Sequence, residues 1–244
     1  MATARALTLA ERARELLGEL ERFPQPEVFE PTRWQGHFTI AANDFQRDAL
    51  LPALMQRLRT QAPGLSLRVI ASDVPTPDML RQQQCQLIIS PRPPEGTDIV
   101  QKRLFEDRYR VFYDPAVRKA PRSRQAYLAA EHVTVLYAPQ RALDLDQHLQ
   151  DQGIERRFRV TVPGFAGVAS FVRGTDLLAT APGLLREHLM RGLADAPVPL
   201  PCPPLPMYMI WHLRHQHDPA HRWLRSQLER CVPARLARSA DAHG

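Results

Sequence analysis

The sequence predicts an α/β fold with largely parallel strands, and three observations support this. Short apolar runs such as HFTIAA at 37–42 and LSLRVI at 65–70 have the length of buried strands. From residue 37 onward they alternate with longer stretches that have helical spacing of their apolar positions. No internal repeat or low-complexity tract interrupts the alternation. Strands and helices that alternate in this way are typical of a sheet covered by helices.

The individual elements follow from this pattern in chain order. We expect strands at 37–42, 65–70, 86–89, 98–104, 108–113, 132–136, 157–162, 177–180 and 207–213. We expect helices at 44–61, 76–83, 123–130, 141–151, 165–173, 182–191 and 219–231. Asp218 followed by Pro219 gives the last helix an N-cap and a proline at its first position. The proline-rich segment 193–206 is interpreted as an extended connection.

A separate amphipathic helix is predicted at the N-terminus. Thr8 and Glu11 have the spacing of a capping box, and Pro24 and Pro26 end the apolar pattern that follows. A single helix before a proline-bearing linker either docks on the body of the protein or pairs with a second copy. We favour pairing.

Size and composition exclude several classes of protein. A chain of 244 residues is long enough for one large domain or two lobes. No window approaches the roughly 18 uninterrupted apolar residues of a membrane span, and the N-terminus lacks the apolar core of a signal peptide. Three cysteines without CxxC spacing argue against a disulfide framework or a zinc site. We therefore expect a cytoplasmic protein with no membrane partner.

The charge balance is basic but dispersed. The net charge of +6 is carried almost wholly by arginine, and the arginines are scattered along the chain. Scattered charges favour a solvated basic surface over a site for a polyanion.

Two junctions between a strand and a helix carry the functional prediction. Asn43 and Asp44 lie where the strand 37–42 gives way to the helix 44–61. The start of a helix binds anions, because its backbone N–H groups are unpaired and carry partial positive charge. In the simpler alternative, Asn43 or Asp44 only caps its own helix. Gly164 and Phe165 open a second such helix, which suggests two lobes facing one cleft.

Several segments of the sequence resemble those of a known family. The segments FTIAANDF, LLPALMQRLRTQAPGLSLRV, RLFEDRYRVFY, AAEHVTVL, GIERRFRVTVPGF, GTDLLATAPG and IWHLRHQHDPAHRWLRSQLE occur in family order. They resemble the effector-binding domain of LysR-type transcriptional regulators, especially the branch with NahR- and NodD-like proteins. The N-terminal TARALTLAERARELL resembles the end of the family's winged helix-turn-helix domain and its linker helix.

The resemblance implies two Rossmann-like lobes of the type 2 periplasmic-binding-protein fold. Residues 1–23 would form the linker and dimerisation helix, 36–113 with 208–235 lobe I, and 114–207 lobe II. A small-molecule effector, with an organic acid as the leading candidate, would bind between the lobes and change the packing of a homodimer or homotetramer. DNA would be contacted only through the winged helix-turn-helix domain, which in the family precedes the linker helix and which we expect to be missing from this chain.

The resemblance also assigns roles to individual residues. Asn43 stands where the family commonly has a serine or threonine that contacts the effector, and an amide can both donate and accept. Ser90 ends another strand at the same cleft, and a plain turn residue is an equal alternative. His132 matches a position at the edge of the pocket in lobe II, with a buried structural histidine as the alternative.

Three further positions complete the predicted site. Relatives that sense aromatic acids carry a bulkier polar residue where this chain has Gly164, so its absence puts an aromatic acid in doubt and predicts a larger pocket. Phe165 and Ile210 are expected as apolar wall, with ordinary core packing as the alternative. The predicted ligand-binding set is therefore Asn43, Asp44, Ser90, His132, Gly164, Phe165 and Ile210.

We expect neither a metal, a cofactor nor catalysis. His212, His215, His217 and His221 are clustered, but no cysteine or carboxylate has the matching metal-ligand spacing. GxSxG, P-loop and GxGxxG motifs are absent from the sequence. The leading function is effector sensing and oligomerisation within a transcriptional regulator. The alternative is a solute-binding protein of the same fold.

Overall fold

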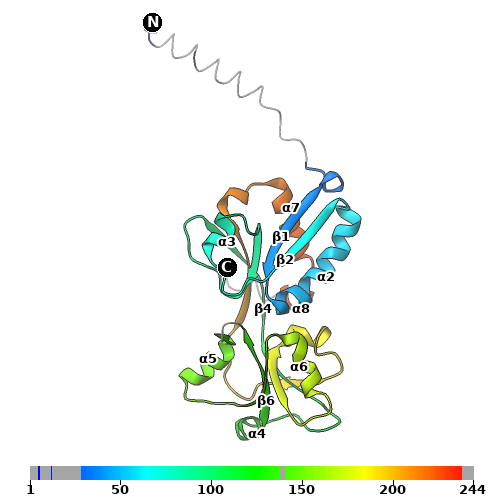
Figure 1. The fold of residues 1–244 in the computed structure, drawn as a ribbon, viewed down its shortest axis with the longest axis vertical. Coiled ribbons are helices and arrows are strands. Elements are labelled where there is room, and N and C mark those ends of the chain that lie inside the picture. The colour runs from blue at the N-terminus through cyan, green and yellow to red at the C-terminus, as the bar shows by residue number, and fades with distance from the viewer. Residues whose placement is uncertain (1–4, 6–11, 13–28, 138–140, 238–244) are drawn as a thin grey trace.

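The computed structural model describes residues 29–137 and 141–237, together with the isolated positions 5 and 12. The described chain forms two lobes that follow one another along the long axis of the molecule (Figure 1). Each lobe is built on one sheet. The strand order is β2-β1-β3-β11-β4 in the first sheet and β10-β5-β9-β6-β7 in the second, where β8 also pairs with β6.

The first lobe contains both ends of the described chain. Its strands are β1 (Gly36–Ala42), β2 (Leu65–Ile70), β3 (Leu87–Ser90), β4 (Ile99–Asp107) and β11 (Leu205–His212). Its helices are η1 (Pro31–Arg33), α2 (Asp44–Gln61), α3 (Pro77–Arg81), η3 (Leu213–His215), α7 (Pro219–Glu229) and α8 (Ala234–Ala237). The predicted cap of the last long helix is confirmed, because Asp218 Oδ1 accepts from the backbone N of Ala220 at 2.9 Å and of His221 at 3.1 Å.

The second lobe is one continuous insertion between β4 and β11. Its strands are β5 (Tyr109–Tyr113), β6 (Glu131–Tyr137), β7 (Arg141–Ala142), β8 (Arg157–Val162), β9 (Leu178–Pro182) and β10 (Ala194–Pro197). Its helices are α4 (Arg124–Ala129), α5 (Asp144–Asp151), α6 (Phe165–Val172) and the 3-10 turn η2 (Gly183–Glu187).

Both sheets are mixed, so the expectation of largely parallel strands is wrong. β1 is parallel to β2 and β3, and β6 is parallel to β8 and β9. β11 is antiparallel to its neighbours β3 and β4, and β5 is antiparallel to β9 and β10. The reason is topological: β4 carries the chain out of the first lobe, and β11 returns beside it in the opposite direction.

The chain changes sheets earlier than the predicted lobe limits of 113 and 208. β4 ends at Asp107 in the first sheet, whereas β5 begins at Tyr109 and pairs with β9 and β10 in the second. On the return, β10 ends at Pro197 and β11 begins at Leu205. Two short connections, Arg108 and residues 198–204, thus join the lobes, and the residues that follow them, Tyr109 and Leu205, line the cleft.

The predicted helix at 182–191 is also wrong. Only the 3-10 turn Gly183–Glu187 forms, because the chain leaves helical geometry at His188, whose φ is −125° and ψ is −100°. Gly183 N donates to Arg108 O at 2.9 Å, and Leu184 N donates to Asp107 Oδ2 at 2.8 Å. These bonds attach the turn to the segment that connects the two sheets.

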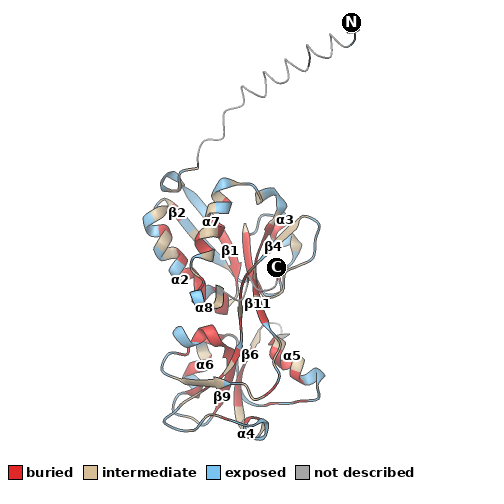
Figure 2. Ribbon diagram, turned by 180° about the vertical axis from the view of Figure 1, so that it is seen from behind, coloured by how far each residue is buried: buried red, intermediate tan, exposed pale blue. Residues whose placement is uncertain are grey.

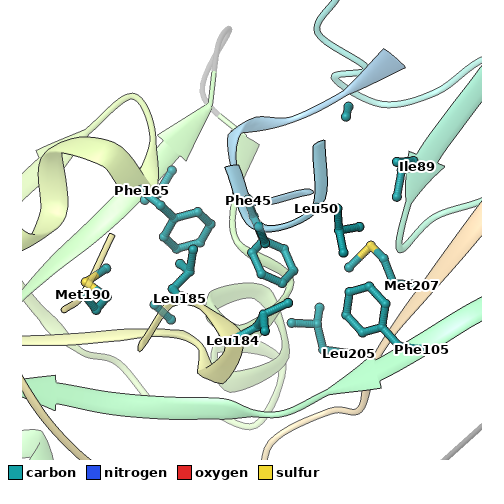
Figure 3. Close-up of a cluster of buried hydrophobic side chains, with 14 of the residues drawn as sticks. Phe45, Leu50, Ile89, Phe105, Phe165, Leu184, Leu185, Met190, Leu205 and Met207 are labelled. Atoms are coloured by element: carbon teal, nitrogen blue, oxygen red, sulfur yellow. The ribbon is translucent and has the colours of Figure 1, made fainter. Parts of the chain in front are cut away.

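The apolar core extends from one lobe into the other. Most residues of the central strands β1, β3, β11, β6 and β9 are buried (Figure 2). Helix α2 covers the first sheet with Leu50, Leu54 and Leu58, each fully buried. At the junction, Phe45 lies between residues of the second lobe, such as Phe165, and residues of the first (Figure 3). The cleft between the lobes therefore has an apolar base.

The predicted N-terminal helix at 1–23 lies outside the described residues, apart from positions 5 and 12. Within the described chain, no helix combines the length and the apolar character needed to cross a membrane.

Candidate ligand-binding cleft

A small cavity lies between the lobes and is lined from both. Its volume is about 60 Å³, enough for about two water molecules. Aromatic, aliphatic and polar side chains line it: Asn43, Phe45, Gln46, Asp73, Ser90, Pro91, Arg92, Tyr109, Tyr137, Leu143, Asp144, Phe165, Pro182, Leu205 and Met207. Three of the predicted site residues, Asn43, Ser90 and Phe165, thus lie together around the cavity.

Asn43 lines the cavity, but its amide is already engaged. Its Nδ2 donates to Asp73 O at 3.2 Å, and its Oδ1 accepts from Asp73 N at 3.0 Å. Asp73 has a positive φ of 43°, an unfavourable conformation for a residue with a Cβ. Asn43 therefore holds a strained loop beside the cleft. It does not cap α2 with its side chain.

Asp44 reaches across the cleft into the second lobe. One carboxylate oxygen accepts from the Tyr137 hydroxyl at 2.7 Å, and the other accepts from the backbone N of Phe165. The carboxylate belongs to the first residue of α2 and lies at the first residue of α6. It thus occupies the position at α6 that the sequence predicted for a ligand anion, and the two helix starts stabilise it together.

Gly164 makes this approach possible. A Cβ built on Gly164 would lie 2.7 Å from Asp44 Oδ2, which is closer than real Cβ contacts. The φ of Gly164 is −175°, which any residue adopts, so the requirement is for space and not for backbone freedom. The room left by the absent side chain is therefore filled by Asp44, and Gly164 does not enlarge the cavity.

A third helix start also faces the cleft. Asp144 is the first residue of α5, and it forms an ion pair with Arg92, in which Arg92 Nε donates at 3.1 Å. Both side chains are partly exposed, at 40 % for Arg92 and 32 % for Asp144. Partly exposed ion pairs contribute about 0–1 kcal/mol, so this bridge orients the lobes more than it stabilises them.

Gln46 is the polar group of the cleft whose bonding is least complete. The residue is 4 % exposed, and its Nε2 donates to the thioether of Met207 at 3.3 Å. Its Oε1 is buried and has no hydrogen-bond partner among the described residues. A buried acceptor without a donor costs about 1–3 kcal/mol. A hydrogen-bond donor placed beside Gln46 Oε1 would therefore lower the free energy of the folded state.

Aromatic rings form the wall around this amide. Phe45 and Phe165 meet edge to face across the lobes with ring centroids 6.5 Å apart. Tyr109 is 7 % exposed, and burial raises the pKa of its hydroxyl, which remains a neutral phenol. Figure 3 shows Phe165, Phe45, Leu205 and Met207 in this continuous apolar layer.

Ser90 lies at the end of β3 and lines the cavity, as predicted. Its Oγ accepts from Arg92 N at 3.1 Å, which is a turn-forming contact. The serine thus fixes the turn that presents Arg92 to the cleft.

His132 and Ile210 are not among the residues that line the cavity. Ile210 is fully buried on the other side of the first sheet, beside Ala41 and Ile88. β11 does contribute to the cleft, but through Leu205 and Met207. Side chains alternate along a strand, and the predicted residue points to the opposite face from the one that faces the ligand cavity.

His132 belongs to a buried polar network inside the second lobe. Its Nε2 donates to Tyr127 O at 2.9 Å, and burial together with the nearby Arg156 charge lowers its pKa to about 4. The Tyr127 hydroxyl contacts Thr180 Oγ1 at 2.7 Å and accepts from Arg156 at 3.1 Å. Arg156 also pairs with Asp146, and both side chains are almost fully buried. The structural alternative for His132 is the one the geometry favours.

The histidines near the C-terminus also make structural contacts. His221 donates from Nε2 to Gln86 O at 3.0 Å, and burial lowers its pKa to about 4. His212 accepts from Arg214 N at 3.0 Å and lies 3.1 Å from Asp98 Oδ2. The described residues contain no group of three or more side chains that could hold a metal ion.

Several cleft residues were missed from the sequence although one signal could have found some of them. Tyr137 ends β6 and Asp144 starts α5, so both obey the rule that located Asn43 and Phe165. Gln46 and Arg92 lie two residues beyond a helix start and a strand end, and no local pattern marks them.

The comparisons with known proteins agree with this geometry. Residues 31–232 match the family described as the LysR substrate binding domain. The transcriptional activator NagR from a Ralstonia species is 28 % identical over 229 residues, covering 91 % of this chain and 76 % of NagR. The transcriptional activator NahR from Pseudomonas putida is 30 % identical over 204 residues, covering 82 % of this chain and 68 % of NahR.

Solved structures show the same architecture. The regulatory domain of MexT, a transcriptional activator in Pseudomonas aeruginosa, superposes with a TM-score of 0.71 at 26 % identity, over 81 % of this chain and 100 % of that one. A probable transcriptional regulator from the same organism gives 0.70 at 29 % identity, over 91 % and 75 %. With the two mixed sheets and the cleft between them, the match over residues 31–232 establishes that this chain belongs to the LysR substrate-binding domain family.

Proposed function

We propose that this chain senses a small molecule in the cleft between its lobes and transmits the binding event to the packing of a regulator. The observation that carries the proposal is the cavity lined by both lobes, whose lining includes Gln46 with its buried, unpaired Oε1. A molecule that contacts both lobes binds one lobe arrangement better than another. Such a difference in affinity is what an effector needs in order to shift a conformational equilibrium.

The cavity of about 60 Å³ bounds the size of the ligand in this arrangement. A molecule of more than a few heavy atoms enters only if the lobes move apart, which breaks the contacts of Asp44 and of the Arg92–Asp144 pair. An organic acid could reach the start of α6 only by replacing the carboxylate of Asp44. A screen for ligands should therefore pair each acid with an uncharged analogue.

The first test is a thermal-shift screen of the chain, followed by calorimetry on each hit. A ligand at 100 times its dissociation constant stabilises the folded state by about 2.7 kcal/mol. For a domain of this size the midpoint of unfolding then rises by roughly 5–10 °C. Each hit is repeated with Gln46→Leu and with Gln56→Leu, a matched change at an exposed position of the same helix.

Gln46→Leu should separate stability from binding. The substitution removes a buried unpaired acceptor, so we expect the free energy of unfolding to stay level or rise by about 1 kcal/mol. Ligand affinity should fall by tenfold or more, whereas Gln56→Leu should leave it unchanged. A hit whose affinity survives Gln46→Leu binds outside this cleft.

The regulatory half of the proposal predicts a homodimer or homotetramer. Size-exclusion chromatography with light scattering checks the assembly with and without the ligand. A strict monomer that stays monomeric when residues 1–23 are deleted would contradict the proposed coupling to packing.

A further inference from the structure

We propose that Asp44 determines the specificity of the cleft, because its carboxylate occupies the position at the start of α6 where a ligand anion would bind. On this account the wild-type cleft takes a small uncharged hydrogen-bond donor in preference to an organic acid. The inference rests on the proposed function, because it assumes that the cleft is the ligand site. It adds the chemical class of the ligand.

The first support is the position of the carboxylate. α6 begins at Phe165, and its N-cap residue is a glycine that offers no side-chain cap. The backbone N–H of Phe165 donates instead to Asp44 from the other lobe. The donor that would hold a ligand carboxylate is therefore already bonded to an internal one.

The second support is the fit of Gly164 to this arrangement. Any side chain at position 164 would begin 2.7 Å from Asp44 Oδ2. The hydroxyl of Tyr137 closes the other side of the carboxylate at 2.7 Å. Space and hydrogen-bond donors are thus matched to Asp44, which leaves no second anion position at this helix start.

The third support is the charge of the cleft. Asp73 and Asp144 line the cavity, and Asp44 lies at its edge. Arg92 is the one cation among the described lining residues, and it pairs with Asp144. Arg47, one turn into α2, is bonded to Asp48 at 2.6 and 2.9 Å. A ligand carboxylate entering here would meet like charges without a cation reserved for it.

The fourth support points to what the cleft accepts. Gln46 Oε1 is a buried acceptor with no partner among the described residues, and it belongs to the lining of the same cavity. A ligand hydroxyl or amide N–H would satisfy it. The cleft therefore combines a buried acceptor that lacks a donor with an occupied anion site, and together these favour an uncharged donor.

Chemical rescue tests the assignment without knowledge of the effector. Asp44→Ala removes one carboxylate, and formate is a carboxylate of that size. Formate is titrated into the full chain at constant ionic strength, with chloride as the reference salt and the midpoint of thermal unfolding as the readout. We expect a saturable rise of roughly 3 °C or more in Asp44→Ala, and none in the wild type.

Two variants control this result. Asp48→Ala removes a carboxylate from the same helix that is bonded to Arg47, and it should not respond to formate. Asp44→Asn keeps an acceptor of the same shape at the start of α6 and should not respond either, and it serves as the folded reference if Asp44→Ala is unstable. In that case Asp44→Ser, which lacks the carboxylate carbon and one oxygen, replaces the alanine variant and should respond.

Equal formate responses in wild type and in the variant, or no response in the variant, would overturn the role of Asp44. So would an acid from the paired screen that binds the wild-type cleft and keeps its affinity in Asp44→Ala. The formate response does not depend on the effector, so it can fail while the Gln46→Leu test succeeds, or the reverse. The two proposals therefore fail separately.

Discussion

The two helix starts that face each other across the cleft are built from the same strand–turn–helix pattern but solve their hydrogen bonding differently. α2 follows β1 and begins with Asn43 and Asp44, whereas α6 follows β8 and begins with Gly164 and Phe165. Neither N-cap side chain caps its own helix. Asn43 holds the loop at Asp73, and Asp44 supplies the acceptor that α6 lacks.

The difference shows that the cap of α6, which is supplied by Asp44, is also a contact between the two lobes. A local cap is present whenever the helix is folded, but a cap from the opposite lobe exists only while the lobes are together. The contacts of Asp44 are therefore sensitive to lobe separation, while the polar network around Arg156 inside the second lobe is not. Variants in the two places should behave differently.

The largest effect is expected in the interior network. Arg156→Met removes one member of a buried pair, and it leaves Asp146, at 4 % side-chain exposure, without its cationic partner. We expect the free energy of unfolding to fall by about 3–5 kcal/mol, measured by urea denaturation. Arg157→Met, at a neighbouring side chain that is 68 % exposed, is the control and should cost less than about 0.5 kcal/mol. Equal losses would show that the interior pair has no special role.

Acid should weaken both lobes through one buried histidine each. Burial lowers the pKa of His132 and of His221 to about 4. In the unfolded chain each titrates near about 6.5, so the unfolded state binds more protons between those values. Stability should be independent of these groups above about pH 7 and should fall by up to about 3 kcal/mol for each between pH 6.5 and 4.

Denaturation at a series of pH values checks this slope. His132→Gln should remove the part of the pH dependence of stability that comes from this ring. His221→Gln should remove the part that comes from the second ring. A slope that is unchanged in His132→Gln would mean that the pKa of this ring is the same in the folded and unfolded states.

A moderate effect is expected at the glycine that admits Asp44. Gly164→Ala places a Cβ where the Asp44 carboxylate lies, so the contact must break or shift. We expect a loss of about 1–3 kcal/mol in thermal or urea unfolding. Gly167→Ala is the matched control, because its Cβ would meet Val162 at an ordinary 3.7 Å. There the gain in helix propensity should stabilise the fold by up to about 1 kcal/mol.

The smallest effect is expected from the second partner of Asp44. Tyr137→Phe removes the hydroxyl that donates to the carboxylate at 2.7 Å and leaves the ring in place. We expect a loss of about 0.5–1.5 kcal/mol. In an Asp44→Ala background the same change should cost less, and a double-mutant cycle measures the difference. Additive losses would argue that the hydroxyl does not depend on Asp44.

Much of the fold could be predicted because apolar periodicity fixes strands and helices locally. The bounds of α2, β2 and β8 agree with the predicted 44–61, 65–70 and 157–162. The helix expected at 182–191 is only a 3-10 turn, because the chain leaves helical geometry at His188, and no local apolar pattern marks that change of direction. The antiparallel returns through β11 and β5 depend on tertiary topology, and apolar runs carry no information on direction.

One rule, that helix starts and strand ends face the cleft, was the basis for predicting most of the site residues. Helix starts and strand ends marked Asn43, Ser90 and Phe165, which line the cavity, and Asp44 and Gly164, which lie against each other beside it. The partner of Asp44 could not be predicted, since local capping and a contact across 121 positions use the same side chain. Ile210 was expected in the wall but lies on the opposite face of β11, because the sequence does not show which face of this strand meets the cleft.

The most direct test of the account is the distance between the lobes with and without the carboxylate of Asp44. Spin labels at Arg59 and Arg124, exposed positions in the first and second lobes, report this distance by pulsed electron resonance after Cys85, Cys202 and Cys231 are replaced by serine. We predict a single narrow distribution for the wild type and a broader, longer one for Asp44→Ala that formate narrows again. Identical distributions in the two proteins would contradict the claim that Asp44 holds the lobes together.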